Sequence, residues 1–101
     1  MKYIAFWEYE SEDTDKLIAK FMKVMESRKK NPEKHVKVLF PPHQLAERAI
    51  NARPQGITIF ETDDEEKIID YVTSYFPELD LKIVPLLDNA KMAESYQKMY
   101  K

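Results

Sequence analysis

Two kinds of hydrophobic pattern alternate along the chain. Continuous or alternating apolar runs predict four strands, over residues 3–9, 36–40, 57–61 and 81–87. Apolar side chains spaced three and four apart predict three helices, over residues 12–30, 63–76 and 89–100, the last capped by Asp88. The order is βαββαβ with an extra C-terminal helix. It predicts an α+β fold with a ferredoxin-like antiparallel sheet.

Both faces of the predicted strands are apolar. One alternating set is aliphatic or aromatic throughout, and we assign it to the face that packs on the helices: Ile4, Phe6, Val36, Val38, Phe40, Ile57, Ile59, Leu81 and Ile83. The other set keeps Tyr3, Trp7, Tyr9 and Phe60 where a solvated face would turn polar. Because contiguous aromatic patches mark interfaces, we predict that these four residues form the interface of a homodimer, a dimeric α+β barrel. The alternative is a monomer in which the helix over residues 89–100 folds back over this face.

The composition is that of a single globular domain over residues 1–101. Hydrophobic residues make up 44% of the chain and charged residues 34%. No apolar run approaches about 18 residues, so no membrane span is predicted. The apolar start is too short for a signal peptide, which makes the cytoplasm the expected location. The absence of cysteine excludes disulfides and cysteine-ligated metal.

Two further counts exclude classes of function. Gly56 is the only glycine, so neither a phosphate-binding loop nor a dinucleotide-binding motif is present. The net charge of −2 offers no electrostatic basis for nucleic-acid binding. Residues 55–60 also lack the motif of RNA-recognition domains, although aromatic side chains lie on the central strands. We expect neither a nucleic-acid partner nor a cofactor.

Three residues are candidates for acid–base catalysis. We expect the strands over residues 3–9 and 57–61 to lie side by side in the same direction, which would bring Glu8 and Glu61 together at one end of the sheet. Paired carboxylates can share a proton and act as acid and base. His43 follows a stiff Pro41-Pro42 turn and titrates near neutrality. The alternative is structural: the glutamates accept hydrogen bonds from helix starts, and His43 caps a turn or helix.

Acidic residues precede both of the first two helices. On the same reasoning they would gather at one pole: Glu8, Glu10, Glu12, Asp13, Asp15, Glu61, Asp63, Asp64, Glu65 and Glu66. Hard cations take such oxygen ligands, but no calcium-loop motif is present and helix starts favour acids in any case. We therefore predict no metal site.

A ligand pocket is the remaining candidate site. In sheets covered by helices on one face, small molecules are held between the two layers. Its predicted lining is Phe40, Met22, Met25 and Tyr71. The same side chains also suit an ordinary core.

Two segments resemble the paired motif of a family of small prokaryotic proteins of unknown function. They are residues 37–43, KVLFPPH, and residues 56–63, GITIFETD, and the segments 77–79 and 84–86 fit the same pattern. The resemblance covers nearly the whole chain and implies a ferredoxin-like, dimeric α+β-barrel fold without implying an activity. The stretch 44–55 departs from it and contains a possible extra helical turn over residues 45–50.

These observations predict a small homodimeric α+β barrel that binds a small molecule or acts in sensing. One alternative is a cofactor-independent enzyme, of isomerase or monooxygenase type, that uses His43 or the pair Glu8 and Glu61. Another is an interaction module whose aromatic sheet face docks a different protein.

Overall fold

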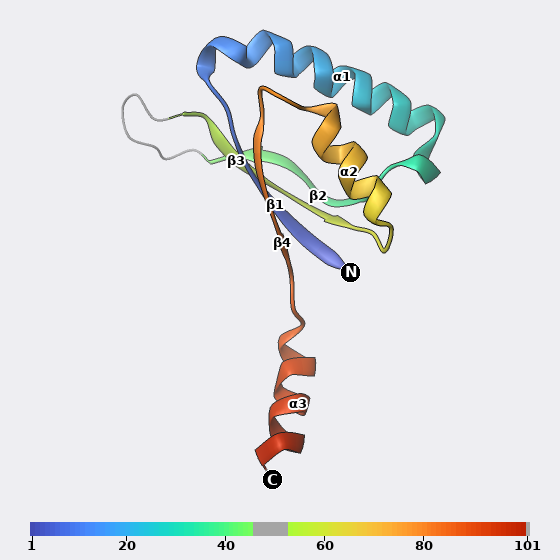
Figure 1. Cartoon of the computed structure of the whole chain (residues 1–101), viewed down its shortest axis with the longest axis vertical. Coiled ribbons are helices and arrows are strands. Elements are labelled where there is room, and N and C mark those ends of the chain that lie inside the picture. Colours follow the sequence, from blue (N-terminus) through green and yellow to red (C-terminus); the bar gives the residue numbers. More distant parts are fainter. Residues whose placement is uncertain (46–52, 101) are drawn as a thin grey trace.

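The computed structural model describes residues 1–45 and 53–100, and this part of the chain forms an α+β fold with four strands and three helices (Figure 1). The strands are β1 (Lys2–Glu8), β2 (Lys37–Gln44), β3 (Gln55–Glu61) and β4 (Asp80–Pro85). The helices are α1 (Thr14–Lys30), α2 (Glu65–Ser74) and α3 (Asn89–Tyr100). Short 3₁₀ turns lie at Ser11–Asp13 and Pro32–Lys34. The α+β class and the order of the elements are confirmed, whereas the helical turn considered for residues 45–50 falls largely outside the described residues.

The strands form one sheet in the order β2-β3-β1-β4, and every neighbouring pair is antiparallel. The antiparallel sheet is therefore confirmed. The expectation that the two central strands run in the same direction is wrong, because β1 and β3 pair head to tail, with Lys2 opposite Glu61 and Glu8 opposite Gln55. The starts of α1 and α2 consequently follow opposite ends of the sheet, and the acidic residues do not share one pole.

The edge strand β2 is longer and less regular than expected. It continues through Pro41 and Pro42 instead of turning there, and its register against β3 shifts twice, between Val38 and Phe40 and between Phe40 and His43. An edge strand tolerates proline because one side of its backbone has no ladder partner. The first shift also moves Phe40 to the face opposite that of Val36.

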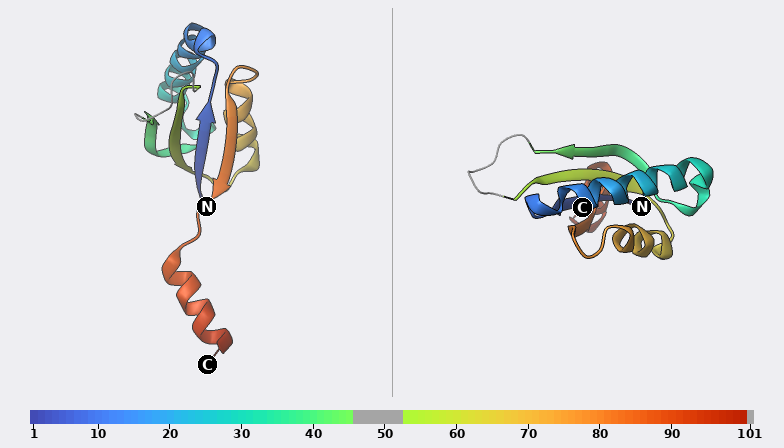
Figure 2. Two further views of the ribbon diagram at one scale, coloured as in Figure 1. Left: turned by 90° about the vertical axis from the view of Figure 1, so that its left-hand side faces the viewer. Right: turned by 90° about the horizontal axis from the view of Figure 1, so that it is seen from above.

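On the two central strands, β1 and β3, the faces are reversed relative to the sequence-based assignment, whereas Val36, Leu81 and Ile83 lie on the helix-covered face as predicted. Helices α1 and α2 lie on one side, behind the strands in the left view of Figure 2. On that inner face Ala5, Val36 and Phe60 are buried, with Tyr3, Ile68, Tyr71, Leu81 and Ile83 packed around them. A second cluster continues the core beneath α1, where Leu17, Val24 and Tyr75 are buried. The rings of Tyr3, Phe60 and Tyr71 pack around the small side chain of Ala5 beneath α2, which explains why the aromatic set lies inside.

An ion pair fastens α1 at the edge of this core. Lys20 Nζ lies 2.8 Å from a carboxylate oxygen of Glu78 and donates a further hydrogen bond, of 2.7 Å, to the carbonyl of Phe76. These contacts join the middle of α1 to the segment between α2 and β4. The helix is therefore held above the inner face at a defined position.

The outer face of the sheet has no covering layer in the described part of the chain. The ladder register places Ile4 beside Ile59 and Phe6 beside Ile57, and Phe6 is 45% exposed. Helix α3 does not cover this face either, because it extends away from the end of the sheet (Figure 1 and the left view of Figure 2). The monomeric alternative, in which this helix folds back over a sheet face, is not the conformation observed.

Candidate binding cavity

A cavity of about 270 Å³ lies between α1 and the inner face of the sheet. Helix α1 contributes Leu17, Ile18 and Phe21 from above, and the strands contribute Trp7 and Thr58 from below. Tyr9, Tyr71 and Tyr75 complete its aromatic wall. The amphipathic spacing of α1 turns its apolar residues toward this space, and the alternation of β1 places Trp7 on the same side as Ala5.

The rings of this wall belong to a continuous series. Tyr3 stacks on Phe60 with ring centres 5.4 Å apart, Phe60 lies 5.1 Å from Tyr71, and Tyr71 meets Tyr75 edge-on at 5.7 Å. Aromatic pairs at these separations stabilise one another beyond the area that they bury. The series joins β1, β3 and α2, and its last two rings, Tyr71 and Tyr75, line the cavity.

Thr58 is the polar centre of the cavity. Its side chain is 1% exposed, and its hydroxyl oxygen accepts a 3.2 Å hydrogen bond from Trp7 Nε1. Burial raises the pKa of the nearby Tyr71 phenol, and Thr58 lowers it by a smaller amount. Buried polar groups need such partners, because an unpaired one costs about 1–3 kcal/mol.

Two tyrosines of the cavity, Tyr71 and Tyr75, remain neutral. Burial raises the pKa of Tyr75 to about 12, and burial also raises the pKa of Tyr71. Their hydroxyl groups are therefore hydrogen-bonding groups instead of bases at ordinary pH. No Asp, Glu, His, Lys or Arg lines the cavity in the described part of the chain. This chemistry suits binding better than proton transfer.

Gly56 allows the indole of Trp7 to lie flat against the sheet. The two residues are cross-strand neighbours, and a β-carbon at position 56 would collide with the Trp7 ring. The glycine is required by this close approach, since its backbone conformation is an ordinary one. Trp7 thereby reaches the cavity and Thr58.

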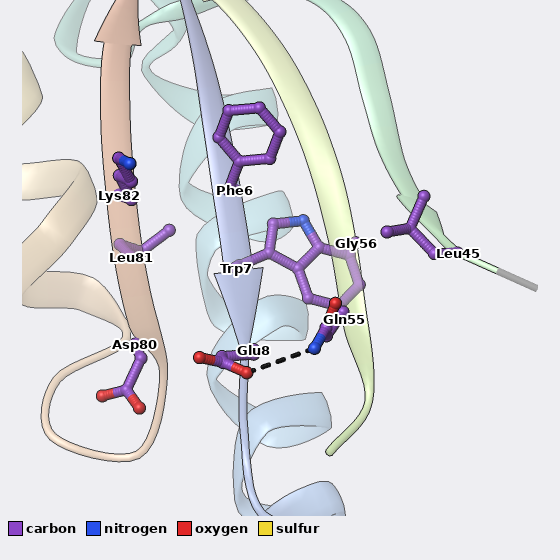
Figure 3. A pocket seen from close by; sticks show the side chains of 9 residues that line it. All are labelled: Phe6, Trp7, Glu8, Leu45, Gln55, Gly56, Asp80, Leu81 and Lys82. Atoms are coloured by element: carbon purple, nitrogen blue, oxygen red, sulfur yellow. Dashed lines mark hydrogen bonds between the residues drawn. The ribbon is translucent and has the colours of Figure 1, made fainter. Parts of the chain in front are cut away.

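A second hollow, also of about 270 Å³, lies where β1 ends and β4 begins (Figure 3). Its charged lining residues are Glu8, Asp80 and Lys82. Arg53 forms ion pairs with three carboxylates at this end of the sheet. Its guanidinium lies 2.8 Å from Asp80, 3.0 Å from Glu10 and 3.5 Å from Glu8.

The carboxylates at this end are already engaged. The hydrogen bond that Arg53 donates to Asp80 raises the pKa of Arg53 and keeps the guanidinium charged, and Gln55 Nε2 donates a 3.4 Å hydrogen bond to a Glu8 oxygen. Glu8 thus has a structural ion partner in Arg53, in place of the hydrogen bond from a helix start that the sequence analysis considered.

The three predicted catalytic residues are not brought together. Glu8 and Glu61 lie at opposite ends of β1, so they do not form a pair. His43 lies within β2 opposite Ile57, where its ring stacks on Phe40 at 4.2 Å and its Nδ1 is 2.6 Å from the carbonyl oxygen of Pro41. The reason is the reversed direction of β3, which the sequence-based pairing did not anticipate.

Of the four predicted ligand-binding residues, Tyr71 alone lines the cavity. Met22 is 61% exposed on α1, and the sulfur of Met25 accepts a weak contact of 3.6 Å from Arg28. Phe40 pairs with Ile59 on the outer face.

The four residues predicted for the dimer interface lie on the inner face. Phe60 is fully buried, and Tyr3 and Tyr9 pack against the two core clusters. Trp7 lines the cavity, as described above. These positions correct the assignment of faces. The open apolar surface is formed by Ile4, Phe6, Phe40, Ile57 and Ile59, which the sequence analysis had placed under the helices.

Sequence reasoning missed Thr58 and Tyr75 as cavity residues. Thr58 is the one polar side chain among the inward residues of β3, and Tyr75 follows Tyr71 by one helical turn. A polar residue within a buried aromatic set and a tyrosine pair at a spacing of four would each have indicated a polar site in the core.

No group of three or more metal-ligating side chains occurs in the described ranges 1–45 and 53–100. The acidic residues before α1 and α2 are separated by the length of the sheet, for the reason given above. Asp64 instead caps α2 by accepting a 2.9 Å hydrogen bond from the amide of Glu66. None of the described helices combines the length and apolar character needed to cross a bilayer.

The chain belongs to a family described as a domain of unknown function, DUF3303, whose model matches residues 1–100. No curated protein and no solved structure gives a significant match to the chain. The family covers almost the whole sequence and assigns no chemistry to it, so the cavity itself has to indicate the function.

Proposed function

We propose that this protein is a homodimeric binding protein that holds a small, largely apolar, aromatic molecule in the cavity beneath α1. One observation carries the proposal: aromatic walls and neutral hydroxyl groups line the cavity without a charged side chain among its described lining residues. Ligand pockets combine an apolar surface with a few fixed polar groups in the same way.

The lining favours one class of ligand. Trp7, Tyr71 and Tyr75 offer ring faces and edges to a planar molecule. Because the tyrosines stay protonated, they favour a neutral hydroxyl or carbonyl group on the ligand over an ammonium or a carboxylate. A volume of about 270 Å³ matches a molecule of one or two fused rings.

A dimer of ferredoxin-like subunits is part of this proposal. The antiparallel order β2-β3-β1-β4 supports that architecture, and the open outer face supports packing of two sheets against each other. The surface concerned is formed by Ile4, Phe6, Phe40, Ile57 and Ile59, in place of the interface first predicted from the sequence. A cytoplasmic location remains a prediction that rests on the sequence.

The enzymatic alternative receives less support. An isomerase or monooxygenase would need an acid or base beside its substrate, but His43 lies on the other face of the sheet from the cavity. Glu8 is held by Arg53. An interaction module would use the open face and leave the cavity without a role.

Trp7 provides a direct test, because it is the only tryptophan in the chain and lines the cavity. Naphthol, a planar aromatic alcohol, is titrated into the protein while the emission of Trp7 is recorded. We expect saturable quenching. Ile18→Phe narrows the cavity from α1 and should weaken naphthol binding at least tenfold. Met22→Phe, one turn further along α1 and outside the cavity, is the matched control and should bind as the wild type does.

The outcomes separate the possibilities. Quenching that is lost in Ile18→Phe and kept in Met22→Phe supports the cavity as the binding site. Equal binding by both variants would assign the probe to another surface and overturn the proposal. Absence of quenching, together with a native mass spectrum free of bound molecules, would also overturn it.

A further inference from the structure

Helix α3 carries an apolar stripe with nothing packed on it. All twelve of its residues are exposed, and it extends away from the sheet (Figures 1 and 2). Met92, Tyr96, Met99 and Tyr100 share one side of the helix and are 52–70% exposed. The rings of Tyr96 and Tyr100 contact each other at 4.7 Å, so this side is already ordered as a surface.

The chain directs α3 away from its own sheet. The amide of Leu86 donates a 2.8 Å hydrogen bond to the carbonyl of Lys2, which fastens the end of β4 beside the start of β1. Asp88 then caps α3, accepting a 2.8 Å bond from the amide of Ala90. The predicted cap is confirmed. Residues 86–88, between this anchor and the helix, lead α3 away from the outer face (Figure 1).

An isolated helix of this length needs packing. Helices shorter than about 12–15 residues are marginal in water, and most of their stability in proteins comes from a buried apolar face. Burial of one methionine or large apolar side chain contributes about 1.5–3 kcal/mol. The stripe of α3 would supply several such contributions on a partner surface.

The area of the open sheet face indicates which partner. Four strands at about 4.8 Å spacing and six residues of about 3.4 Å rise give a footprint of roughly 400 Å². A stable interface buries about 800 Å² on each partner. A helix of twelve residues is about 18 Å long and about 10 Å wide, and each subunit of a symmetric pair would both donate one such face and receive one. The helix face that a subunit donates and the one that it receives, added to the sheet face, bring the buried area per subunit close to the roughly 800 Å² of a stable interface.

The base of α3 has the charges that such an exchange needs. A crevice of about 580 Å³ separates the start of α3 from the end of the sheet. Its charged lining residues are Lys2, Lys91, Glu61 and Asp88, two of each sign. In a twofold interface the same patch meets a copy of itself, so a patch that carries both signs can pair each charge with an opposite one.

We propose that α3 is a dimerisation arm that packs Met92, Tyr96 and Met99 onto a second copy of this chain, reciprocally. The arm extends the contact made by the open sheet faces. The inference rests on the proposed homodimer and adds to it the element that completes the interface.

Two substitutions in the last turn of α3 test the arm. Met99→Lys adds a charge to the stripe, whereas Gln97→Lys adds the same charge on the opposite side of the helix. Lysine suits the end of a helix, so neither change disfavours α3 itself. The dissociation constant of the dimer is measured by sedimentation, and helical content by circular dichroism. We expect Met99→Lys to weaken the dimer at least tenfold and Gln97→Lys to change it less than twofold.

Phe6→Lys, on the outer sheet face, separates failure of the arm from failure of the dimer. Dissociation by both Met99→Lys and Phe6→Lys, with Gln97→Lys unaffected, supports the arm. Dissociation by Phe6→Lys alone overturns the arm and leaves the sheet-mediated dimer. If Met99→Lys and Gln97→Lys weaken the dimer equally, the effect is not specific to the apolar stripe and the proposed arm is overturned. A wild-type chain that is monomeric at all concentrations overturns the dimer and the arm together.

Discussion

The two faces of this sheet are both apolar, yet they differ in every property that matters for function. The inner face is built of rings, with Thr58 at its centre and two helices above it. The outer face carries Ile4, Phe6, Ile57 and Ile59 without a hydroxyl group in their midst and without cover in the described chain. Hydrophobicity alone therefore does not reveal which face is the core. Hydrogen-bonding groups distinguish the cavity, and absence of cover distinguishes the surface proposed to pair.

The largest difference between the faces should appear in stability. Phe60→Ala removes a fully buried ring from the inner face, and we expect a loss of about 3–5 kcal/mol in the free energy of unfolding. Phe6→Ala, on the outer face, should cost the folded monomer about 1 kcal/mol or less, because Phe6 is already half exposed there. Urea unfolding at low protein concentration compares the two. Similar losses in both variants would contradict the distinction between core and surface.

The polar centre of the inner face gives the next largest effect. Thr58→Val keeps the shape of the side chain but deprives Trp7 Nε1 of its hydrogen-bond acceptor. We expect a loss of about 1–3 kcal/mol in unfolding free energy. Thr73→Val makes the same exchange at an exposed position on α2 and should be close to neutral. Equal effects would show that the hydroxyl of Thr58 is dispensable.

The buried phenols should make the inner face sensitive to alkali. The pKa of Tyr75 is about 12 in the folded chain against 10.0 for an ordinary tyrosine, so its contribution is present below pH 10 and is lost as the pH rises toward 12. Tyr75→Phe should therefore lose less stability than the wild type between these values. Tyr100→Phe, an exposed tyrosine of α3, should follow the wild type. The free energy of unfolding of the wild type and of both variants is measured across this pH range, alongside the ultraviolet titration of the phenols. An equal loss of stability in the wild type and Tyr75→Phe would contradict the prediction.

The smallest effect concerns the ion pair that fastens α1 over the inner face. The hydrogen bond from Lys20 lowers the pKa of Glu78 below its ordinary value of 4.5. The stability that this pair contributes is present above pH 4.5 and is lost as the pH falls through the lowered folded pKa. The difference in stability between wild type and Glu78→Gln should shrink on acidification. Glu94→Gln, on exposed α3, should show no such trend. If the difference in stability between wild type and Glu78→Gln stays constant as the pH falls, the ion pair between Lys20 and Glu78 is not needed to hold α1 over the inner face.

Local patterns were sufficient for the elements and insufficient for the site. Seven helices and strands were predicted in the correct order, because periodicities of 3.6 and 2 reflect which side of an element is buried. The predicted catalytic pair failed because it depended on the direction of β3, which the hairpin from β2 reverses. Of the predicted cavity residues Tyr71 was found, while Thr58 and Tyr75 were missed because their roles depend on contacts between distant elements.

The sequence by itself determined the α+β class, the absence of cysteine chemistry and the presence of two apolar strand faces. Alternation along a strand shows that two faces exist, but it does not show which of them is buried. Exchanging the buried and the exposed face leaves the sequence pattern unchanged. Only the tertiary structure decided that the rings of Tyr3, Trp7 and Phe60 lie beneath the helices and that α3 stands free. The physical reason is packing: the space between helices and sheet fits rings beside Ala5, and that space exists only once β1, β3 and α1 have come together.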